Sequence, residues 1–439
     1  MSLASSTVHT AAIGERALAL IRELYPICRS ITGEGVRRTL RRIQQEIPLQ
    51  LVEVPSGTAV FDWTVPPEWN IRDAYIQDAS GRKVVDFQQC SLHVMSYSTP
   101  VQSRFSLAEL KAHLHTVPGH PEWIPFRTSY YNQNWGFCLS GRQLQSLADG
   151  EYDVRIDSTL DSKGSLTYGE CLIHGATDGE VVITTHVCHP SLCNDNLSGI
   201  SVATLLAQAL AERSLRYTYR LLFIPTTIGS ITWLATHPEV IPRIRHGLVL
   251  TGVGDKGALR YKKSRHGATT IDRVMAHVLH HSGKEFSLAE FSPYGYDERQ
   301  FCSPGFDLPV GSLMRTPYGQ YPEYHTSGDN IEFVRAESLE GTYRACLQAI
   351  DILEGDATYR STNPHCEPQL GKRGLYRAIA GQQDKQTREL NLLWVLNLSD
   401  GRHSLLDIAE RSGLPFPGIR EAATVLLDCG LLELLQGPA

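Results

Sequence analysis

Two side chains that commonly bind metal ions lie close together in the sequence, around the end of one predicted strand. His186 follows the apolar run of residues 181–184, which predicts a buried strand. Asp195 comes just before residues 200–210, whose small residues and leucines predict a helix. Ligands of open α/β sheets bind at the carboxyl ends of strands, and His and Asp are both zinc ligands. The stretch therefore indicates a metal-dependent hydrolase, or a protein built from one.

A structural explanation of the same residues stays open at this point. A histidine after a strand is often an ordinary hydrogen-bonded polar residue. Asp195-Asn196, followed by Ser198-Gly199, also fits a turn that begins a helix. In that case the stretch would need no metal.

A third candidate ligand comes from a distant segment, residues 315–330, which is rich in charged, aromatic and turn-forming residues. Zinc takes about four ligands, and a catalytic site leaves one position to water. His186, Asp195 and His325 supply three ligands of the right type. His189 is a less favoured candidate, because the chain beyond the strand can turn its side chain away.

Acidic residues in two loop segments could handle protons. Asp297, Glu298 and Glu323 are candidates for a general acid or base, for a fourth ligand, or for a partner that orients an imidazole. Arg315, Tyr318 and Tyr321 could hold an anionic or peptide-like substrate, since arginine grips carboxylates in a planar fork. An ion pair of Arg315 with Asp329 or Glu323 is the equally favoured structural alternative.

Composition limits the class of protein. The 439 residues suffice for two or three domains, and a hydrophobic fraction of 42% allows ordinary cores. A net charge of -6 argues against a general nucleic-acid or membrane-surface binder. The 10 cysteines are scattered without a C-x-x-C pair, so free thiols in a reducing compartment are expected. A Cys/His zinc site at Cys188 and Cys193 lacks a second cluster that would complete it.

Segment patterns predict three parts. Residues 1–55 and 150–360 alternate strands and helices, which predicts a discontinuous α/β domain: a mainly parallel twisted sheet with helices on both faces. Residues 56–149, rich in Pro and aromatic residues, predict a β-rich insertion, in which residues 93–97 are one expected strand. Residues 365–439 predict a winged helix-turn-helix, with helical stretches at 375–380, 390–397, 405–411 and 419–429.

Partners and location follow from the same patterns. Met1 to Glu15 has no signal-peptide pattern, and no apolar window reaches 18 residues, so a cytoplasmic protein without a membrane partner is expected. The second helix of the predicted winged helix carries Arg420 but also Glu421 and Asp428. Phosphate binding needs several cations on one face, so no nucleic-acid partner is expected. A packing role, or homo-oligomer formation through the inserted or winged-helix domain, is expected instead.

Several long motifs resemble bacterial proteins that combine an aminopeptidase-like domain of the zinc-exopeptidase superfamily, a nested domain of once-unknown function and a C-terminal winged helix-turn-helix. The motifs are residues 29–37, 186–199, 228–230, 297–300, 321–327 and 398–401. The resemblance covers nearly the whole chain. It implies that His186, Asp195 and His325 correspond to metal ligands of the superfamily, which holds di-zinc aminopeptidases and single-zinc glutaminyl cyclases.

One position departs from the family pattern. Relatives usually have Pro-Glu-Thr-Ile-Gly-Ser where this chain has Pro225-Thr226-Thr227-Ile228-Gly229-Ser230. A Glu there would be a general base or a ligand. The Thr226 hydroxyl does not ionise near neutral pH and binds zinc poorly, so Thr226 is a candidate substrate-binding residue instead. We therefore expect Thr226→Glu to raise hydrolysis. The strand ending at Gly252 also lacks the Asp of di-zinc members, so one zinc ion is favoured over two.

The sequence thus predicts a zinc-dependent, aminopeptidase-like hydrolase that acts on an amide or aminoacyl bond of a small or modified substrate. Two alternatives stay open. The scaffold could catalyse a non-hydrolytic transfer or cyclisation in a biosynthetic pathway, because Thr226 replaces the expected Glu. It could also be a non-catalytic binding or regulatory protein.

Overall fold

A computed structural model describes residues 6–375 and 382–435 of the chain. The described residues form two compact units. The first contains the residues up to Thr269 together with Glu285–Arg344. The second contains Thr270–Lys284 and the residues from Ala345 onward. Each unit is described by itself.

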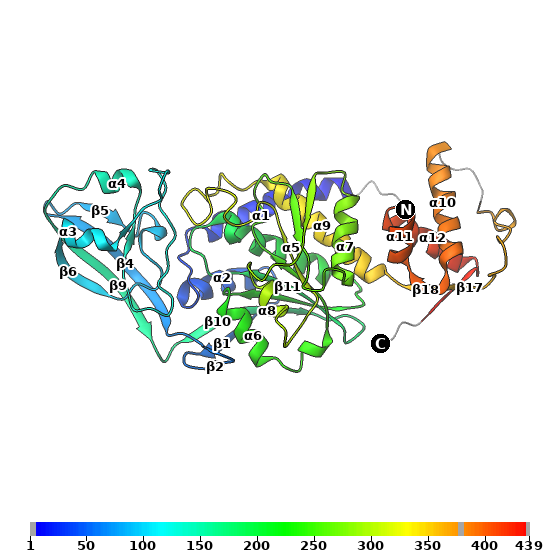
Figure 1. Cartoon of the computed structure of the whole chain (residues 1–439), viewed down its shortest axis with the longest axis horizontal. Coiled ribbons are helices and arrows are strands. Elements are labelled where there is room, and N and C mark those ends of the chain that lie inside the picture. The colour runs from blue at the N-terminus through cyan, green and yellow to red at the C-terminus, as the bar shows by residue number, and fades with distance from the viewer. Residues whose placement is uncertain (1–5, 376–381, 436–439) are drawn as a thin grey trace. The chain divides into compact units, whose positions relative to one another are not determined.

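An eight-stranded sheet forms the centre of the first unit (Figure 1). Its strands, in spatial order, are β1 (Gln50–Pro55), β10 (Ser165–Ile173), β12 (Thr218–Ile224), β11 (Glu180–His186), β13 (Ile244–Leu250), β16 (Val310–Met314), β14 (Leu259–Lys262) and β15 (Phe286–Ala289). The strands β12, β11, β13 and β16 are parallel. Antiparallel pairs join β1 to β10, β10 to β12 and β16 to β14. The predicted α/β class is confirmed, and its parallel part is the centre of a mixed sheet.

Helices cover both faces of this sheet. Gly169 of β10 and Thr185 of β11 pair with the same residue of β12, so both point to one face. That face carries α2 (Glu34–Gln44) against Gly169 and α5 (Ser198–Ala211), whose Gly199 lies against Thr185. Because side chains alternate along a strand, Glu170 points to the opposite face. There it accepts a hydrogen bond (3.1 Å) from Trp233 of α6 (Ile228–Thr236).

A second, antiparallel sheet lies in the same unit. Its order is β5 (Lys83–Asp86), β4 (Glu68–Asp78), β9 (Glu151–Asp161) and β6 (Val101–Ser106). The predicted boundary at residue 149 assigns β9 to the α/β domain, but β9 pairs along its length with β4 and β6. The strand expected at residues 93–97 is absent there, where a short 3-10 turn (Ser91–His93) and a loop are found instead.

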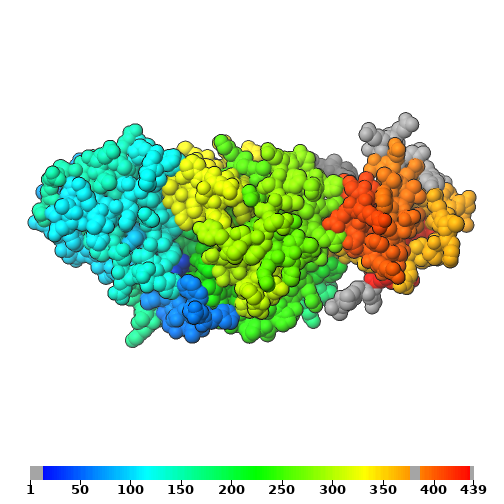
Figure 2. All heavy atoms as spheres, in the orientation of Figure 1, coloured from blue at the N-terminus to red at the C-terminus, as the bar shows by residue number. Residues whose placement is uncertain are grey.

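Smaller elements complete this part of the unit. They are α1 (Ser6–Leu24), α3 (Leu107–Leu110), α4 (Gly141–Gln145), and the paired strands β7 (Leu114–His115) and β8 (Phe137–Cys138). Figure 2 shows the hairpin of β2 (Ala59–Val60) and β3 (Trp63–Thr64), in blue, on the molecular surface. Its turn residue Phe61 is 64% exposed, whereas Val60 is buried and anchors the hairpin.

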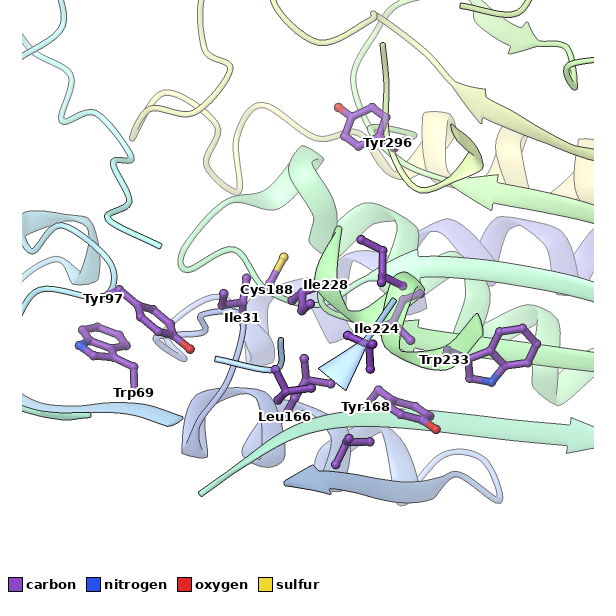
Figure 3. Packing of buried hydrophobic residues seen from close by; sticks show 14 of the residues in the cluster. Ile31, Trp69, Tyr97, Leu166, Tyr168, Cys188, Ile224, Ile228, Trp233 and Tyr296 are labelled. Atoms are coloured by element: carbon purple, nitrogen blue, oxygen red, sulfur yellow. The ribbon is translucent and has the colours of Figure 1, made fainter. Parts of the chain in front are cut away.

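One hydrophobic cluster continues from the large sheet into the second sheet (Figure 3). Trp69 of β4 stacks on Tyr97, with ring centroids 5.8 Å apart. Thr32, from the motif of residues 29–37, lies 2.6 Å from the Tyr97 hydroxyl and accepts the Trp69 backbone N–H at 2.9 Å. Ser30 of the same motif contacts Ser96 at 2.7 Å. The motif therefore joins the two sheets.

The second unit has the elements of a winged helix. These are α10 (Gln382–Leu398), α11 (Leu405–Ser412), α12 (Phe416–Asp428) and a sheet of β18 (Asp400–Ser404), β17 (Thr358–Ser361) and β19 (Leu432–Leu434). The strand β17 thus precedes the expected domain start at residue 365. The unit also contains α7 (Thr270–His280) and the end of α9 (Ala336–Gly355). The predicted winged helix is confirmed; of the helical stretch expected at 375–380, residues 376–380 lie outside the described part.

The helix α7 is tied to this winged helix by charge and by hydrogen bonds. Arg273 of α7 forms ion pairs with Asp407 and Glu410 of α11. The Phe416 N–H at the start of α12 donates to His277 Nε2 at 3.1 Å. The ten cysteines, all within the described residues, form no disulfide. Among the described helices we find none with the length and apolar character that crossing a bilayer requires.

Candidate metal centre

His186 and Asp195 meet at the carboxyl end of the central strands. His186 is the last residue of β11, and Asp195 lies in the irregular turn at residues 193–197 that leads into α5. His186 Nε2 is 2.8 Å from Asp195 Oδ1, and neither side chain is exposed to solvent. This is the edge of the sheet at which ligands of α/β folds bind.

His325 approaches the same carboxylate from the other side. Its Nε2 is 3.0 Å from Asp195 Oδ2, and its side chain is 32% exposed. Its backbone is in the left-handed region (φ 54°), which a non-glycine residue adopts at a cost. The Phe126 N–H donates to the His325 carbonyl at 2.7 Å and helps to hold this backbone. The structure therefore places two of the predicted ligands, His186 and His325, against the two carboxylate oxygens of the third, Asp195.

His189 also belongs to this cluster. Ligand atoms of His186, His189 and Asp195 all lie within 4.8 Å of one another. The His189 ring is 4.8 Å from the His186 ring and 5.1 Å from the His325 ring. Sequence reasoning ranked His189 low, because spacing alone did not show how the chain turns after β11.

The protonation states around the centre suit a cation. Burial opposes ionisation of Asp195, yet the His189 and His186 imidazoles hold the pKa of its carboxyl well below the usual range. Burial lowers the pKa of His189 well below its usual value, so its imidazole is neutral. A carboxylate and neutral imidazoles are the forms that bind zinc. The donor set therefore fits a zinc ion.

Buried polar side chains hold the two ligand-bearing loops. Asp329 accepts the backbone N–H of Asn194 at 2.6 Å and that of Asp195 at 2.9 Å. Asn196 donates to Thr185 Oγ1 at 2.8 Å and accepts the Gly252 N–H at 3.1 Å. The sequence analysis did not predict these positioning roles. The feature that could have indicated them is the density of Asn and Asp residues next to the candidate ligands.

Asp297 contacts Thr226, the position at which the sequence departs from the family pattern. Its Oδ1 accepts hydrogen bonds from Thr226 and Ser230, each at 2.9 Å, while its Oδ2 is buried and has no hydrogen-bond partner among the described residues. Burial raises the pKa of this carboxyl, and the His186 imidazole acts in the opposite direction. A carboxylate therefore lies within hydrogen-bonding distance of the residue where the family pattern has Glu.

Glu298, the other acidic residue of this segment, is a buried member of an ion pair. It begins α8 (Glu298–Phe301), is fully buried, and pairs with Lys262 at 2.8 Å. The same ammonium donates to the Ser292 and Tyr294 carbonyls at 2.7 and 3.0 Å. Glu298 and Lys262 therefore hold the loop that leads to Asp297.

The expected substrate-binding residues lie in different environments. Arg315 donates to the carbonyls of Val253, Gly257 and Ser338 at 3.1, 2.6 and 2.7 Å, so its guanidinium supports loops. The Tyr318 hydroxyl donates to the Tyr294 carbonyl at 2.8 Å.

Two further predicted residues lie beside the His325 loop. Tyr321 is buried and stacks on Phe333, with ring centroids 5.4 Å apart. Glu323 is half-buried, and its carbonyl accepts hydrogen bonds from Thr326.

Tyrosine rings cover two of the imidazoles. Tyr324 stacks on His325, with ring centroids 3.9 Å apart, and Tyr296 stacks on His186 at 5.5 Å. Tyr318 contacts Tyr296 edge to face at 5.3 Å. The cluster therefore lies beneath an aromatic layer.

Comparisons with known proteins agree with this architecture. Residues 18–356 match the family described as "Domain of unknown function (DUF4910)", and residues 357–434 match a winged helix-turn-helix family. A protein of Clostridium acetobutylicum named "Putative polysaccharide biosynthesis protein with aminopeptidase-like domain" is 52% identical over 416 residues, which are 95% of each chain.

Solved structures are similar as well. A crystal structure described as that of a "putative peptidase" from Clostridium acetobutylicum matches with a TM-score of 0.93 and 49% identity, covering 98% of both chains. A zinc aminopeptidase from Bacillus subtilis matches with a TM-score of 0.55 and 13% identity, covering 77% of this chain and 94% of that one. The second likeness concerns the fold alone.

Proposed function

The chain belongs to the family described as a domain of unknown function (DUF4910), with a winged helix-turn-helix at its carboxyl end, and on that basis we propose that it is a metal-dependent hydrolase of an amide or aminoacyl bond. The observation that carries the proposal is the cluster of imidazoles around the buried Asp195 carboxylate. The aminopeptidase fold of the Bacillus subtilis zinc enzyme is consistent with it.

One zinc ion is the proposed cofactor. Asp195, His186 and the neighbouring imidazoles would hold it, with His325 as the ligand that the sequence predicts. When bound, zinc supplies Lewis acidity toward a carbonyl oxygen and toward a water molecule. Burial of Asp195 favours this role, because a buried carboxylate is stable only beside cations or hydrogen-bond donors.

Asp297 is the proposed general base. It takes a proton from the water that attacks the carbonyl carbon. Its Oδ2 is free of hydrogen-bond partners among the described side chains, and its raised pKa brings it closer to neutral pH, where a general base works best. Thr226 and Ser230 orient the carboxylate through Oδ1. General-base help is worth about 10²–10⁴-fold in rate.

The proposed substrate is a small or modified molecule with an amide. The Clostridium acetobutylicum relative is named for polysaccharide biosynthesis, so an acylated or aminoacylated sugar is a reasonable first test. The tyrosine layer of Tyr296, Tyr318 and Tyr324 would supply flat apolar faces to such a ring. No nucleic-acid partner is proposed for the winged helix, whose α12 carries Glu421 and Asp428 beside Arg420.

A second candidate function is a non-hydrolytic transfer or cyclisation on the same scaffold. The specific observation in its favour is Thr226, because the missing Glu changes the groups that activate water. The same assay separates the two functions, since only hydrolysis releases an amine and a carboxylate with uptake of water.

The test begins with metal analysis of the purified protein. Amine release is then measured on aminoacyl amides and on N-acylated amino sugars, before and after chelation and after return of zinc. Release that is lost with chelator and regained with zinc supports the proposal. A metal-loaded protein that converts none of these amides argues against hydrolysis.

A further inference from the structure

We propose that the substrate is an anionic sugar derivative, and that Arg299 and Arg260 bind the phosphate or carboxylate group that it carries. The inference rests on the proposed function and names a property of its substrate. Arg299 belongs to the sequence motif of residues 297–300. In that motif Asp297 is the proposed base and Glu298 forms a buried ion pair, whereas Arg299 has no role so far.

The Arg299 guanidinium lies on the side of the metal centre that carries the proposed base. Arg299 is the second residue of α8, and its Nη2 is 3.5 Å from Thr227 Oγ1. Thr227 follows Thr226, whose hydroxyl donates to Asp297 at 2.9 Å. The guanidinium therefore lies next to the turn that orients the Asp297 carboxylate.

No protein anion neutralises this guanidinium. Among the residues that the structure describes, no carboxylate lies within ion-pairing distance of Arg299, and its buried Nε has no hydrogen-bond partner. The neighbouring Glu298 carboxylate is paired with Lys262 at 2.8 Å instead. Arg299 is half-buried, so its guanidinium has lost part of its hydration. An anion that binds there would compensate for this loss with charge-assisted hydrogen bonds.

Arg260 supplies a second guanidinium near the same loop. It lies in β14 two positions before Lys262, and side chains two positions apart on a strand point to one face. Lys262 donates to the Tyr294 carbonyl at 3.0 Å, so this face is turned toward the loop that precedes α8. Arg260 is half-buried, and none of the described carboxylates pairs with it. It therefore adds a second positive charge without a counter-charge from the protein.

The tyrosine layer lies beside both charges. Burial raises the pKa of Tyr318, and the Arg299 and Arg260 guanidiniums act in the opposite direction, which places both near its hydroxyl. The Tyr318 ring contacts the rings of Tyr296 and Tyr294, each at 5.3 Å, and Tyr294 is 69% exposed. Aromatic faces beside two guanidiniums suit a sugar that carries an anion. The sugar ring packs on the tyrosines, and the guanidinium forks bind the oxygens of the anion.

The experiment compares N-acetylglucosamine with three anionic forms of it: the 1-phosphate, the 6-phosphate and the 6-carboxylate. Binding is measured by titration calorimetry on the metal-free full-length protein, so that zinc cannot bind the anion itself. KM and kcat are then measured on the zinc-loaded protein. We expect the wild type to bind at least one anionic sugar about 10-fold or more tightly than the neutral sugar.

The variant Arg299→Met keeps the aliphatic part of the side chain and removes its charge. It should weaken binding of the preferred anionic sugar about 10- to 100-fold, because hydrogen bonds to a charged group are lost, and leave binding of the neutral sugar unchanged. Arg299→Lys should recover part of the loss, and Arg260→Met should cause a smaller one. Arg104→Met is the matched control, because Arg104 forms an exposed ion pair with Asp153 in the second sheet, and it should change neither affinity.

The anionic forms also identify the anion. Tighter binding of a phosphate form assigns a phosphorylated sugar, and tighter binding of the carboxylate form assigns a sugar acid. Inorganic phosphate is titrated as well, and binding as tight as that of the phosphorylated sugars would contradict a sugar ligand.

Two further results would overturn the inference. One is a wild type that prefers none of the anionic sugars, and the other is an Arg299→Met variant, folded by circular dichroism, that binds neutral and anionic sugars equally less well. Failure of the proposed function looks different. The wild type would then prefer an anionic sugar and Arg299→Met would lose this preference, yet the zinc-loaded wild type would hydrolyse none of the amides.

Discussion

Placing Glu at the half-buried position 226 would set a second carboxylate against the buried Asp297 carboxylate. Thr226 Oγ1 donates to Asp297 Oδ1 at 2.9 Å, and the glutamate replaces this donor with a second negative charge. Two unit charges about 4 Å apart at an effective dielectric constant of about 20 repel by about 4 kcal/mol. Because of this contact and the proposed role of Asp297 as the base, we expect Thr226→Glu to lower hydrolysis, the opposite of the expectation from sequence alone.

The first measurement needs no substrate. Urea unfolding at pH 7 should show that Thr226→Glu loses about 2–4 kcal/mol of stability, an estimate that combines the repulsion with the lost hydrogen bond. The loss should shrink as the pH falls and one carboxyl is protonated. The double variant Thr226→Glu/Asp297→Ser restores one carboxylate and one hydroxyl, so it should recover most of the stability.

The second measurement is the pH dependence of amide hydrolysis at constant metal content. In Thr226→Glu the added charge raises the pKa of the Asp297 carboxyl, so the general base is protonated at neutral pH and the rate should fall about 10- to 100-fold. Thr226→Ser keeps the hydroxyl donor and serves as the matched control, with a rate near that of the wild type. Higher hydrolysis by Thr226→Glu at pH 7 would refute the role of Asp297 as the base.

Three further predictions follow from other contacts. Lys262→Met leaves the buried Glu298 carboxylate without its ammonium partner, so the free energy of unfolding should drop by about 3–5 kcal/mol. The control Lys263→Met, at a surface ion pair, should change the free energy of unfolding by less than about 1 kcal/mol. Equal losses in the two variants would contradict this prediction. Asp329→Asn presents an amide group to the Asn194 and Asp195 N–H groups, so zinc affinity should fall about 10- to 100-fold by chelator competition, and unchanged affinity would count against the positioning role. Burial lowers the pKa of His277 to about 4. As the pH falls, the unfolded state therefore binds the extra proton first, and the free energy of unfolding should decline by up to about 3 kcal/mol between about pH 6.5 and pH 4. His277→Gln should lack this part of the decline, and a pH dependence of its unfolding free energy identical to that of the wild type would disprove it.

Local patterns in the sequence were sufficient for the fold class and for two of the site residues. The apolar run before His186 and the small-residue helix after Asp195 are short-range signals, and both elements form where they were predicted. A strand end and a helix start bring residues nine positions apart to the same edge, so their contact at 2.8 Å needed no long-range information. The winged helix was likewise readable from its helix spacing.

Contacts between distant segments were decided only by the tertiary structure. Asp297 meets Thr226 across 71 positions and Arg29 meets His189 across 160, and no periodicity or spacing encodes such pairs. The same holds for His189 and His325, which approach Asp195 from different loops. The sequence alone determines which side chains the protein has for such a site. Sheet register and loop packing determine which of them share one buried volume, and there charge, burial and hydrogen bonding determine the chemistry.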